Sequence, residues 1–161
     1  MSDPDTVEVS VHVEATPAAV YPYLTDPDRY VQWMGSHATL EPVAGGTYRV
    51  HMSDGFKASG TFLDVEPPHR LTFTWGFADD AAATHVKHDH AEASGGGGMP
   101  AGSTRVVVTL EEEGDGTLVS LRHEELPNSE LRDAHRVAWG TYLPRLAIRA
   151  AGGDPGPDPH A

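Results

Sequence analysis

The 161-residue sequence predicts an α+β fold in which one antiparallel sheet curls around a single long C-terminal helix. The first observation is a series of short segments that alternate apolar and polar residues, as half-buried strands do. The second is their spacing, because consecutive strands joined by short turns pair in antiparallel fashion. The third is an apolar face between residues 131 and 146 that repeats at three- and four-residue steps, which predicts one long helix.

The N-terminal segment predicts a strand followed by a helix. Residues 7–13 alternate valine with polar residues, which favours a half-buried strand. Thr16-Pro17 then predicts a helix start, since threonine caps helices and proline is tolerated at the first helical position. We expect this helix to run to about residue 24 in a distorted form, because Pro22 lies inside it and its ring would strike the preceding turn.

A second short helix and six further strands follow. Asp26-Pro27 repeats the cap-and-proline signal and predicts a helix through Trp33. Asp54-Gly55 predicts a tight hairpin turn. The polar residues 111–116 predict another turn, and the acidic cluster within them is interpreted as solvated. The strands are expected at residues 37–41, 47–52, 56–65, 71–77, 106–110 and 118–123.

The last helix begins near Asn128 or Ser129, either of which can cap it. Its predicted inner face consists of Leu131, His135, Ala138, Trp139, Tyr142 and Leu146. Pro144 lies inside this helix and predicts a kink. One domain is therefore expected over residues 6–150, with a flexible insert at 79–101 and a disordered tail at 151–161.

The insert contains a histidine-rich stretch that offers two interpretations. His85, His88 and His90 could hold Zn²⁺ or Ni²⁺ if the segment were ordered. The alternative is a solvated loop, which the glycine-rich, non-periodic composition favours. Because no zinc-type spacing is present, no metal or other cofactor is predicted.

Composition excludes several functional classes. The net charge is −13, with Lys57 and Lys87 the two lysines, so a nucleic-acid partner is not expected. No apolar run is long enough to span a membrane, and the acidic N-terminus lacks the apolar segment of a secretory signal. The absence of cysteine excludes disulfides and a cysteine nucleophile. A soluble cytoplasmic location is therefore expected.

The order of elements and several short motifs together resemble the START-like (SRPBCC, helix-grip) superfamily, and within it the family of activator of Hsp90 ATPase homologues (AHSA1-like). The motifs are Thr16-Pro17-Ala18-Ala19-Val20, Thr25-Asp26-Pro27 with Trp33, Gly45-Gly46-Thr47-Tyr48, residues 60–75, residues 116–124, and Ala138-Trp139 with Leu143 and Leu146. The resemblance implies a curved seven-stranded antiparallel sheet that grips the C-terminal helix, with an apolar cavity between them. It does not imply one chemistry, because relatives include lipid binders, cyclase-like enzymes and Hsp90 co-chaperones. The long 79–101 connection and Pro22 depart from the family pattern.

Alternation along the strands and spacing along the helices predict a set of inward side chains. They form either a ligand cavity with stacking surfaces, which the resemblance favours, or a filled core. The candidate ligand-binding residues are Trp33, Tyr48, Val50, Met52, Phe62, Phe73, Trp75, Phe77, Val108, Leu121, His123, His135, Trp139 and Tyr142. Arg49 and Arg122 alternate with inward-facing residues of their strands, so their side chains are expected to face outward and form surface ion pairs.

His123 is the candidate with the most chemistry. It shares parity with Val119 and Leu121, so it should face inward, where imidazole can anchor a ligand or accept a proton. The plainer interpretation is a histidine satisfied by a backbone carbonyl or a neighbouring glutamate. No hydrolase, nucleotide-binding or magnesium motif is present, so no catalytic residue is predicted.

The preferred hypothesis is a binding protein for an apolar or amphipathic small molecule held between sheet and helix. A cyclase- or hydrolase-like enzyme with His123 as general base is the first alternative. A chaperone-associated protein-binding module is the second. A homodimer is a further expected assembly.

Overall fold

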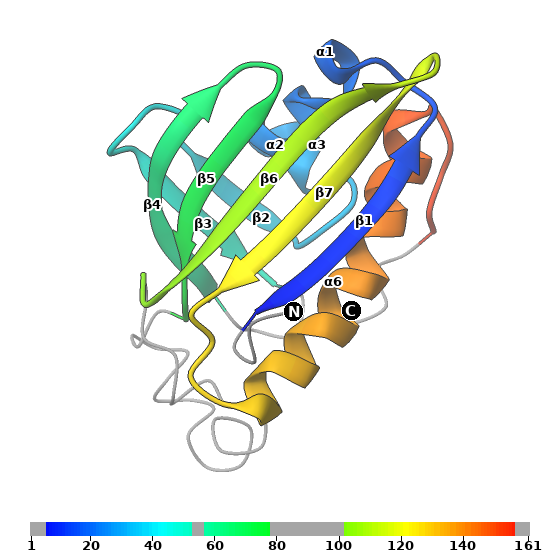
Figure 1. Ribbon diagram of the computed structural model, residues 1–161. Helices are drawn as coiled ribbons and strands as arrows, with labels where there is room; N and C mark the ends of the chain where they lie inside the picture. The colour runs from blue at the N-terminus through cyan, green and yellow to red at the C-terminus, as the bar shows by residue number, and fades with distance from the viewer. Residues whose placement is uncertain (1–5, 53–56, 78–101, 157–161) are drawn as a thin grey trace.

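The computed structural model describes residues 6–52, 57–77 and 102–156. They form a seven-stranded antiparallel sheet with strand order β1-β7-β6-β5-β4-β3-β2, which curves around one long helix (Figure 1). The elements are β1 (Val7–Val13), α1 (Pro17–Val20), α2 (Pro22–Thr25), α3 (Pro27–Tyr30), β2 (His37–Leu40), β3 (Thr47–His51), β4 (Lys57–Glu66), β5 (Arg70–Trp75), β6 (Thr104–Glu113), β7 (Gly116–Glu124) and α6 (Ser129–Ala150). The predicted α+β helix-grip architecture is thereby confirmed.

The helical segment after β1 consists of three one-turn helices, where two short helices were predicted. Each of them begins with a proline, at Pro17, Pro22 and Pro27. The prediction of one helix from residue 16 to 24 was therefore wrong in its continuity. Pro22 has no backbone N–H to continue α1, so the chain starts a new turn there. The side chains of Thr16 and Asp26 cap α1 and α3, as their sequence signals indicated.

Alternation along the strands sorts their side chains onto two faces. Val106, Val108 and Leu110 of β6 are buried on the inner face, and the β6–β7 hairpin places Val119, Leu121 and His123 beside them. Register pairs Val106 with His123 and Val108 with Leu121. The predicted hairpin turn at 54–55, the insert at 79–101 and its histidines lie outside the described residues.

Helix α6 lies along β1 and covers the inner face of the sheet (Figure 1). Asn128 caps it by accepting a hydrogen bond from the Leu131 backbone N–H at 2.8 Å. Pro144 lies inside α6 without ending it. The buried side chains of the helix are Leu131, His135, Trp139, Tyr142, Leu143 and Leu146. All but Leu143 belong to the predicted inner face, and Ala138, also predicted there, is only partly buried.

Residues 151–156 of the predicted tail make defined contacts with the rest of the fold. The Arg145 guanidinium donates hydrogen bonds to the carbonyls of Trp33 at 3.0 Å, Pro155 at 3.1 Å and Gly156 at 3.0 Å. Arg145 therefore joins α6 to the end of the helical segment and to the chain that follows α6.

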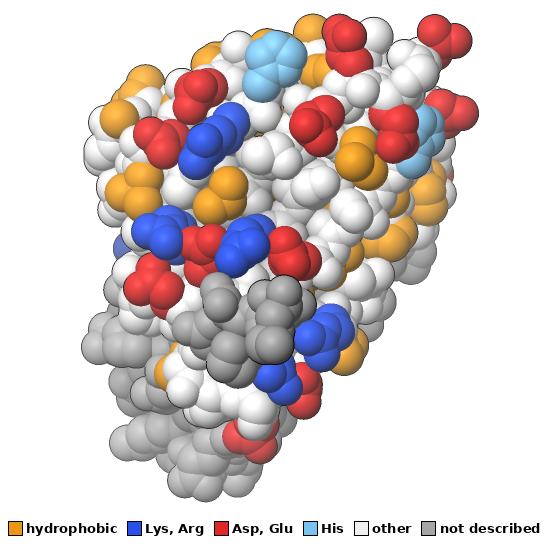
Figure 2. Space-filling view, viewed as in Figure 1, with side chains coloured by type: hydrophobic (Ala, Val, Ile, Leu, Met, Phe, Trp, Pro, Cys, Tyr) orange, Lys and Arg blue, Asp and Glu red, His pale blue; other side chains and the backbone are white. Residues whose placement is uncertain are grey.

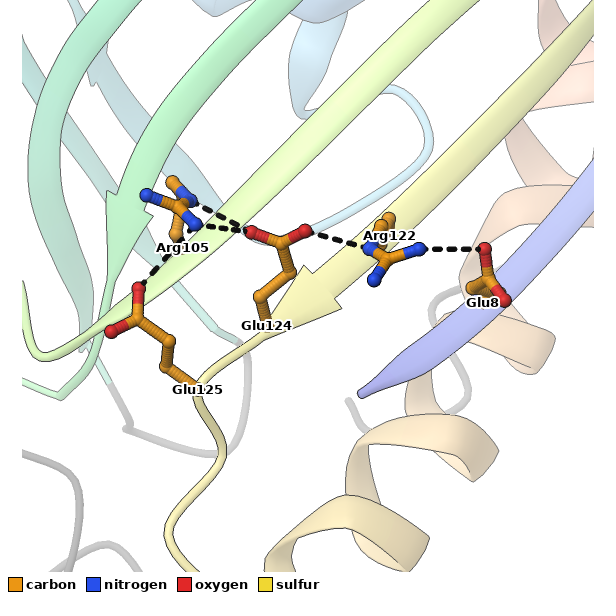
Figure 3. Close-up of polar contacts among 5 residues, drawn as sticks. All are labelled: Glu8, Arg105, Arg122, Glu124 and Glu125. Atoms are coloured by element: carbon orange, nitrogen blue, oxygen red, sulfur yellow. Dashed lines mark hydrogen bonds and ion pairs between the residues drawn. The ribbon is translucent and has the colours of Figure 1, made fainter. Parts of the chain in front are cut away.

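The outer face of the sheet is polar and carries an ion-pair ladder across three strands (Figure 3). Glu124 accepts from Arg105 at 2.6 Å and from Arg122 at 2.6 Å, and Arg122 continues to Glu8 at 3.3 Å. Burial alone would raise the pKa of Glu124, but hydrogen bonds from both arginines outweigh it and lower that pKa. Acidic and basic side chains alternate across this face (Figure 2), which confirms the outward ion pairing predicted for Arg122.

Candidate functional site

The predicted inward residues come together between the sheet and α6. Met52 and Phe77 are half-buried, and every other member of the predicted set is buried. Tyr48 lies at the centre, with its ring stacked on Phe73 at 4.0 Å and tilted against Trp75 at 5.9 Å between centroids. Alternation along the strands and spacing along the helices therefore identified side chains that face the interior.

Large buried side chains pack together here. Among the described residues they leave a cavity of about 10 Å³, which holds about one water molecule. Trp33, Phe73, Val108, Leu121 and Trp139 of the predicted set line it. Four residues outside that set also line it, namely Leu24, Tyr30, Leu71 and Leu143. A larger ligand can enter this cavity only if side chains move.

Tyr30 is a lining residue that the predicted site omitted. Its hydroxyl lies 2.5 Å from the Tyr48 hydroxyl and 3.8 Å from the Met34 sulfur. Burial raises the pKa of both tyrosines, so both hydroxyls are neutral, and Tyr48 can donate to Tyr30 while Tyr30 donates to Met34. The signal available in the sequence was its three-residue spacing from Trp33, which places both rings on one side of the helical segment.

Further along the inner face, towards the N-terminal half of α6, lies a cluster of two indoles, two imidazoles and a phenyl ring. Trp75 and Phe77 come from β5 and the residues after it, His123 from β7, and His135 and Trp139 from α6. Ring centroids lie 5.0 Å apart for His123 and His135, 5.2 Å for Trp75 and Trp139, and 6.1 Å for Phe77 and His135. We call these five residues the indole–imidazole cluster.

His123 has a hydrogen-bond partner at each ring nitrogen. Trp139 Nε1 lies 3.0 Å from His123 Nδ1, and an indole N–H can only donate, so Nδ1 accepts. The proton of the neutral ring is therefore on Nε2, which lies 2.7 Å from Thr104 Oγ1. Thr104 in turn donates to the Trp75 carbonyl at 2.7 Å. These hydrogen bonds form a continuous series from Trp139 through His123 and Thr104 to the Trp75 backbone.

His135 and Trp75 each keep one polar group unused. His135 Nδ1 lies 2.8 Å from the Leu131 carbonyl, which can only accept, so Nδ1 carries the proton. Its Nε2 lone pair has no hydrogen-bond partner among the described residues. The Nε1–H of Trp75 is buried and likewise has none there.

The cluster is electrically neutral near pH 7. Burial lowers the pKa of His123 well below its usual value, and the neighbouring His135 lowers it further. Burial also lowers the pKa of His135, although the hydrogen bond to Leu131 opposes the shift. The cluster thus offers an uncharged donor, the buried Nε1–H of Trp75, and an uncharged acceptor, Nε2 of His135.

The comparisons with known proteins address the fold and the family. A model of the family "Activator of Hsp90 ATPase homolog 1-like protein" matches residues 14–151. The chain belongs to this family. The resemblance found in the sequence is thereby confirmed.

Solved AHSA1-like structures share the fold. The solution NMR structure of an AHSA1-like protein from Rhizobium etli has 38% identity and a TM-score of 0.68, over 96% of this chain and 86% of that one. DynU16, a protein in the dynemicin biosynthetic locus, has 27% identity and a TM-score of 0.72, over 96% of this chain and 49% of that one, so this chain spans about half the length of DynU16. CalU16 from Micromonospora echinospora has 26% identity and a TM-score of 0.64, over 91% and 76% of the two chains. A comparison with curated proteins finds no match.

A second hollow in this AHSA1-like fold lies on the outer face of the sheet. It is an open depression of about 280 Å³ across β1, β7 and β6. Hydroxyl-bearing, aliphatic and charged residues line it, and its arginine is already paired with Glu8 and Glu124. The lining residues are Glu8, Val9, Ser10, Val107, Thr109, Ser120, Leu121 and Arg122. The aromatic enclosure predicted from the sequence is therefore separate from this depression.

Within residues 6–52, 57–77 and 102–156, no group of three or more potential ligand side chains is arranged to hold a metal ion. No helix in those same ranges is both long and apolar enough to cross a membrane.

Proposed function

We propose that this AHSA1-like protein binds an amphipathic small molecule at the indole–imidazole cluster, between the inner face of the sheet and α6. The observation that carries the proposal is the unpartnered Nε1–H of Trp75, a side chain that is 4% exposed. The family fold is compatible with this role, since it supports small-molecule binding or a cyclase-like activity.

An unsatisfied buried donor is unusual and costs about 1–3 kcal/mol. The other two tryptophans contrast with Trp75. Trp33 donates to the Tyr23 carbonyl at 2.8 Å, and Trp139 donates to His123. A ligand that accepts a hydrogen bond from Trp75 would recover that cost, so its binding energy has a defined source.

The cavity of about 10 Å³ that Trp139 helps to line is too small for a ligand, so we expect a side chain of the cluster to move when the ligand binds. Phe77 is half-buried and packs against Trp75 at 6.3 Å and His135 at 6.1 Å between centroids. It is therefore the side chain that we expect to move. Its displacement would open the cluster and present the faces of Trp75 and His135 to an aromatic ligand.

An enzymatic role with His123 as general base has less support from this geometry. A neutral imidazole has one lone pair, and that of His123 accepts from Trp139. Proton transfer to His123 would require this bond to break and a charge to form in a buried position. Small-molecule binding requires neither step.

Indole N–H signals in a two-dimensional ¹H–¹⁵N NMR spectrum test the proposal directly, since the chain has three tryptophans. On titration with 1-naphthol, the Trp75 indole signal, assigned through Trp75→Phe, should move and saturate. The Trp33 indole signal should move least, because that N–H is bonded to a backbone carbonyl. If no indole signal moves up to the solubility limit of 1-naphthol, the proposal is wrong.

A further inference from the structure

We infer that the polar group of the ligand bound at this cluster is a neutral hydroxyl, which accepts a hydrogen bond from Trp75 and donates one to His135. We infer also that the cluster disfavours carboxylates. The inference rests on the proposed function and specifies the chemistry of its ligand.

Most hydrogen-bonding groups of the cluster already have partners. The chain from Trp139 through His123 and Thr104 to the Trp75 carbonyl uses every polar side-chain atom that it contains. His135 Nδ1 is used by Leu131. One donor, the Nε1–H of Trp75, and one acceptor, Nε2 of His135, are left over in the described part of the cluster.

The two groups are carried by neighbouring rings. The rings of Trp75 and His135 lie 6.3 Å apart between centroids and nearly perpendicular, at 85°. A hydroxyl is the smallest neutral group that can both accept a hydrogen bond, as Trp75 requires, and donate one, as His135 requires.

Burial lowers the pKa of both imidazoles, His135 lowers that of His123 further, and the hydrogen bond to Leu131 opposes the shift of His135; no carboxylate or guanidinium of the described residues contributes to either shift. A carboxylate bound here would lose its hydration without gaining a countercharge from the described residues, which is costly. It would also direct a lone pair at the lone pair of His135.

Other functional groups satisfy only one of the two nitrogens. An ether can accept from Trp75 but has no proton for His135. An ammonium group can donate to His135 but leaves Trp75 without an acceptor and introduces a charge. A hydroxyl on an aromatic ring satisfies both groups, and the rings of Phe77 and Trp139 supply apolar contacts for its body.

Four probes with one ring system test this specificity in the intact chain: 1-naphthol, 1-methoxynaphthalene, naphthalene and 1-naphthoate. At about 1 kcal/mol for each hydrogen bond, 1-methoxynaphthalene should bind about 5-fold and 1-naphthol about 25-fold more tightly than naphthalene. 1-Naphthoate should bind more weakly than naphthalene. Dissociation constants are measured from the quenching of tryptophan fluorescence and from the NMR titration.

Two variants assign the two hydrogen bonds. Trp75→Phe should abolish the advantage of 1-methoxynaphthalene over naphthalene, and His135→Leu should abolish that of 1-naphthol over 1-methoxynaphthalene. Both readouts are ratios within one variant, so a general loss of stability does not mimic them. Thr72→Val, a substitution of a buried β5 residue on the outer side of the sheet, should leave both ratios unchanged.

The outcomes separate the two proposals. If 1-naphthoate binds as tightly as 1-naphthol, or if both ratios equal one in the wild-type chain, the hydroxyl inference is wrong while small-molecule binding stands. If none of the four probes binds, the proposed function itself fails.

Discussion

The hydroxyl of Thr104 is the link in the buried polar chain that can be removed with the least change of shape. In Thr104→Val the side chain keeps its branching, but the Nε2–H of His123 and the Trp75 carbonyl lose their shared partner. Thr104 is 2% exposed, so water does not replace that partner at the surface. We expect a loss of unfolding free energy of about 2–4 kcal/mol, from two broken hydrogen bonds and one stranded buried donor.

Thr72 offers a matched control for this prediction. It is 3% exposed in the neighbouring strand, and its hydroxyl has no hydrogen-bond partner in the described structure. Thr72→Val removes an unsatisfied buried hydroxyl, so its stability should stay the same or rise by up to about 1 kcal/mol. The same substitution at two buried positions should therefore have opposite effects.

Urea denaturation at pH 7.5, followed by tryptophan fluorescence, measures both changes. With a slope of about 2 kcal/mol per molar urea, Thr104→Val should lower the midpoint by about 1–2 M. Equal midpoints for the Thr104→Val and Thr72→Val variants would refute the reasoning, because they would mean that the hydrogen bonds of Thr104 contribute nothing.

Three further predictions concern charge. Burial lowers the pKa of His123 and His135, so below about pH 6.5 the unfolded chain binds more protons than the folded chain. The free energy of unfolding should therefore fall as the pH is lowered from 6.5 to 5.5, by up to about 1.4 kcal/mol per pH unit for each imidazole. His135→Gln should reduce this slope in pH-dependent melting curves, and an unchanged slope would contradict the assignment. Arg145→Met removes three hydrogen bonds to carbonyls and should cost about 1–3 kcal/mol with faster amide exchange at Gly156, whereas Arg136→Met, at an exposed ion pair, should cost less than about 0.5 kcal/mol. Arg122→Gln should lower stability by no more than about 1 kcal/mol, by an amount that shrinks in 1 M NaCl; a cost that persists at high salt would show that the ladder acts by packing.

The sequence alone determined the architecture and the sidedness of the sheet. Alternation with period two placed Val106, Leu121 and His123 on the inner face and Arg122 on the outer face, because successive side chains of a strand point to opposite sides. The three- and four-residue spacing along α6 identified Trp139 among its buried face in the same way. Pro22 also signalled a disturbed helix, although not that the helix would divide into separate turns.

Tertiary structure decided how much space remains inside and which polar atoms have partners. Periodicity reports a direction but not a rotamer or a volume, so the sequence could not show that the cavity lined by Tyr30 and Trp33 would measure only about 10 Å³. The bonding of His123 depends on Thr104 and Trp139, which come from different elements, and a hydrogen bond forms only when atoms from such elements meet within a few tenths of an ångström. For the same reason, the free nitrogens of Trp75 and His135 became visible only once the neighbours of each ring were in place.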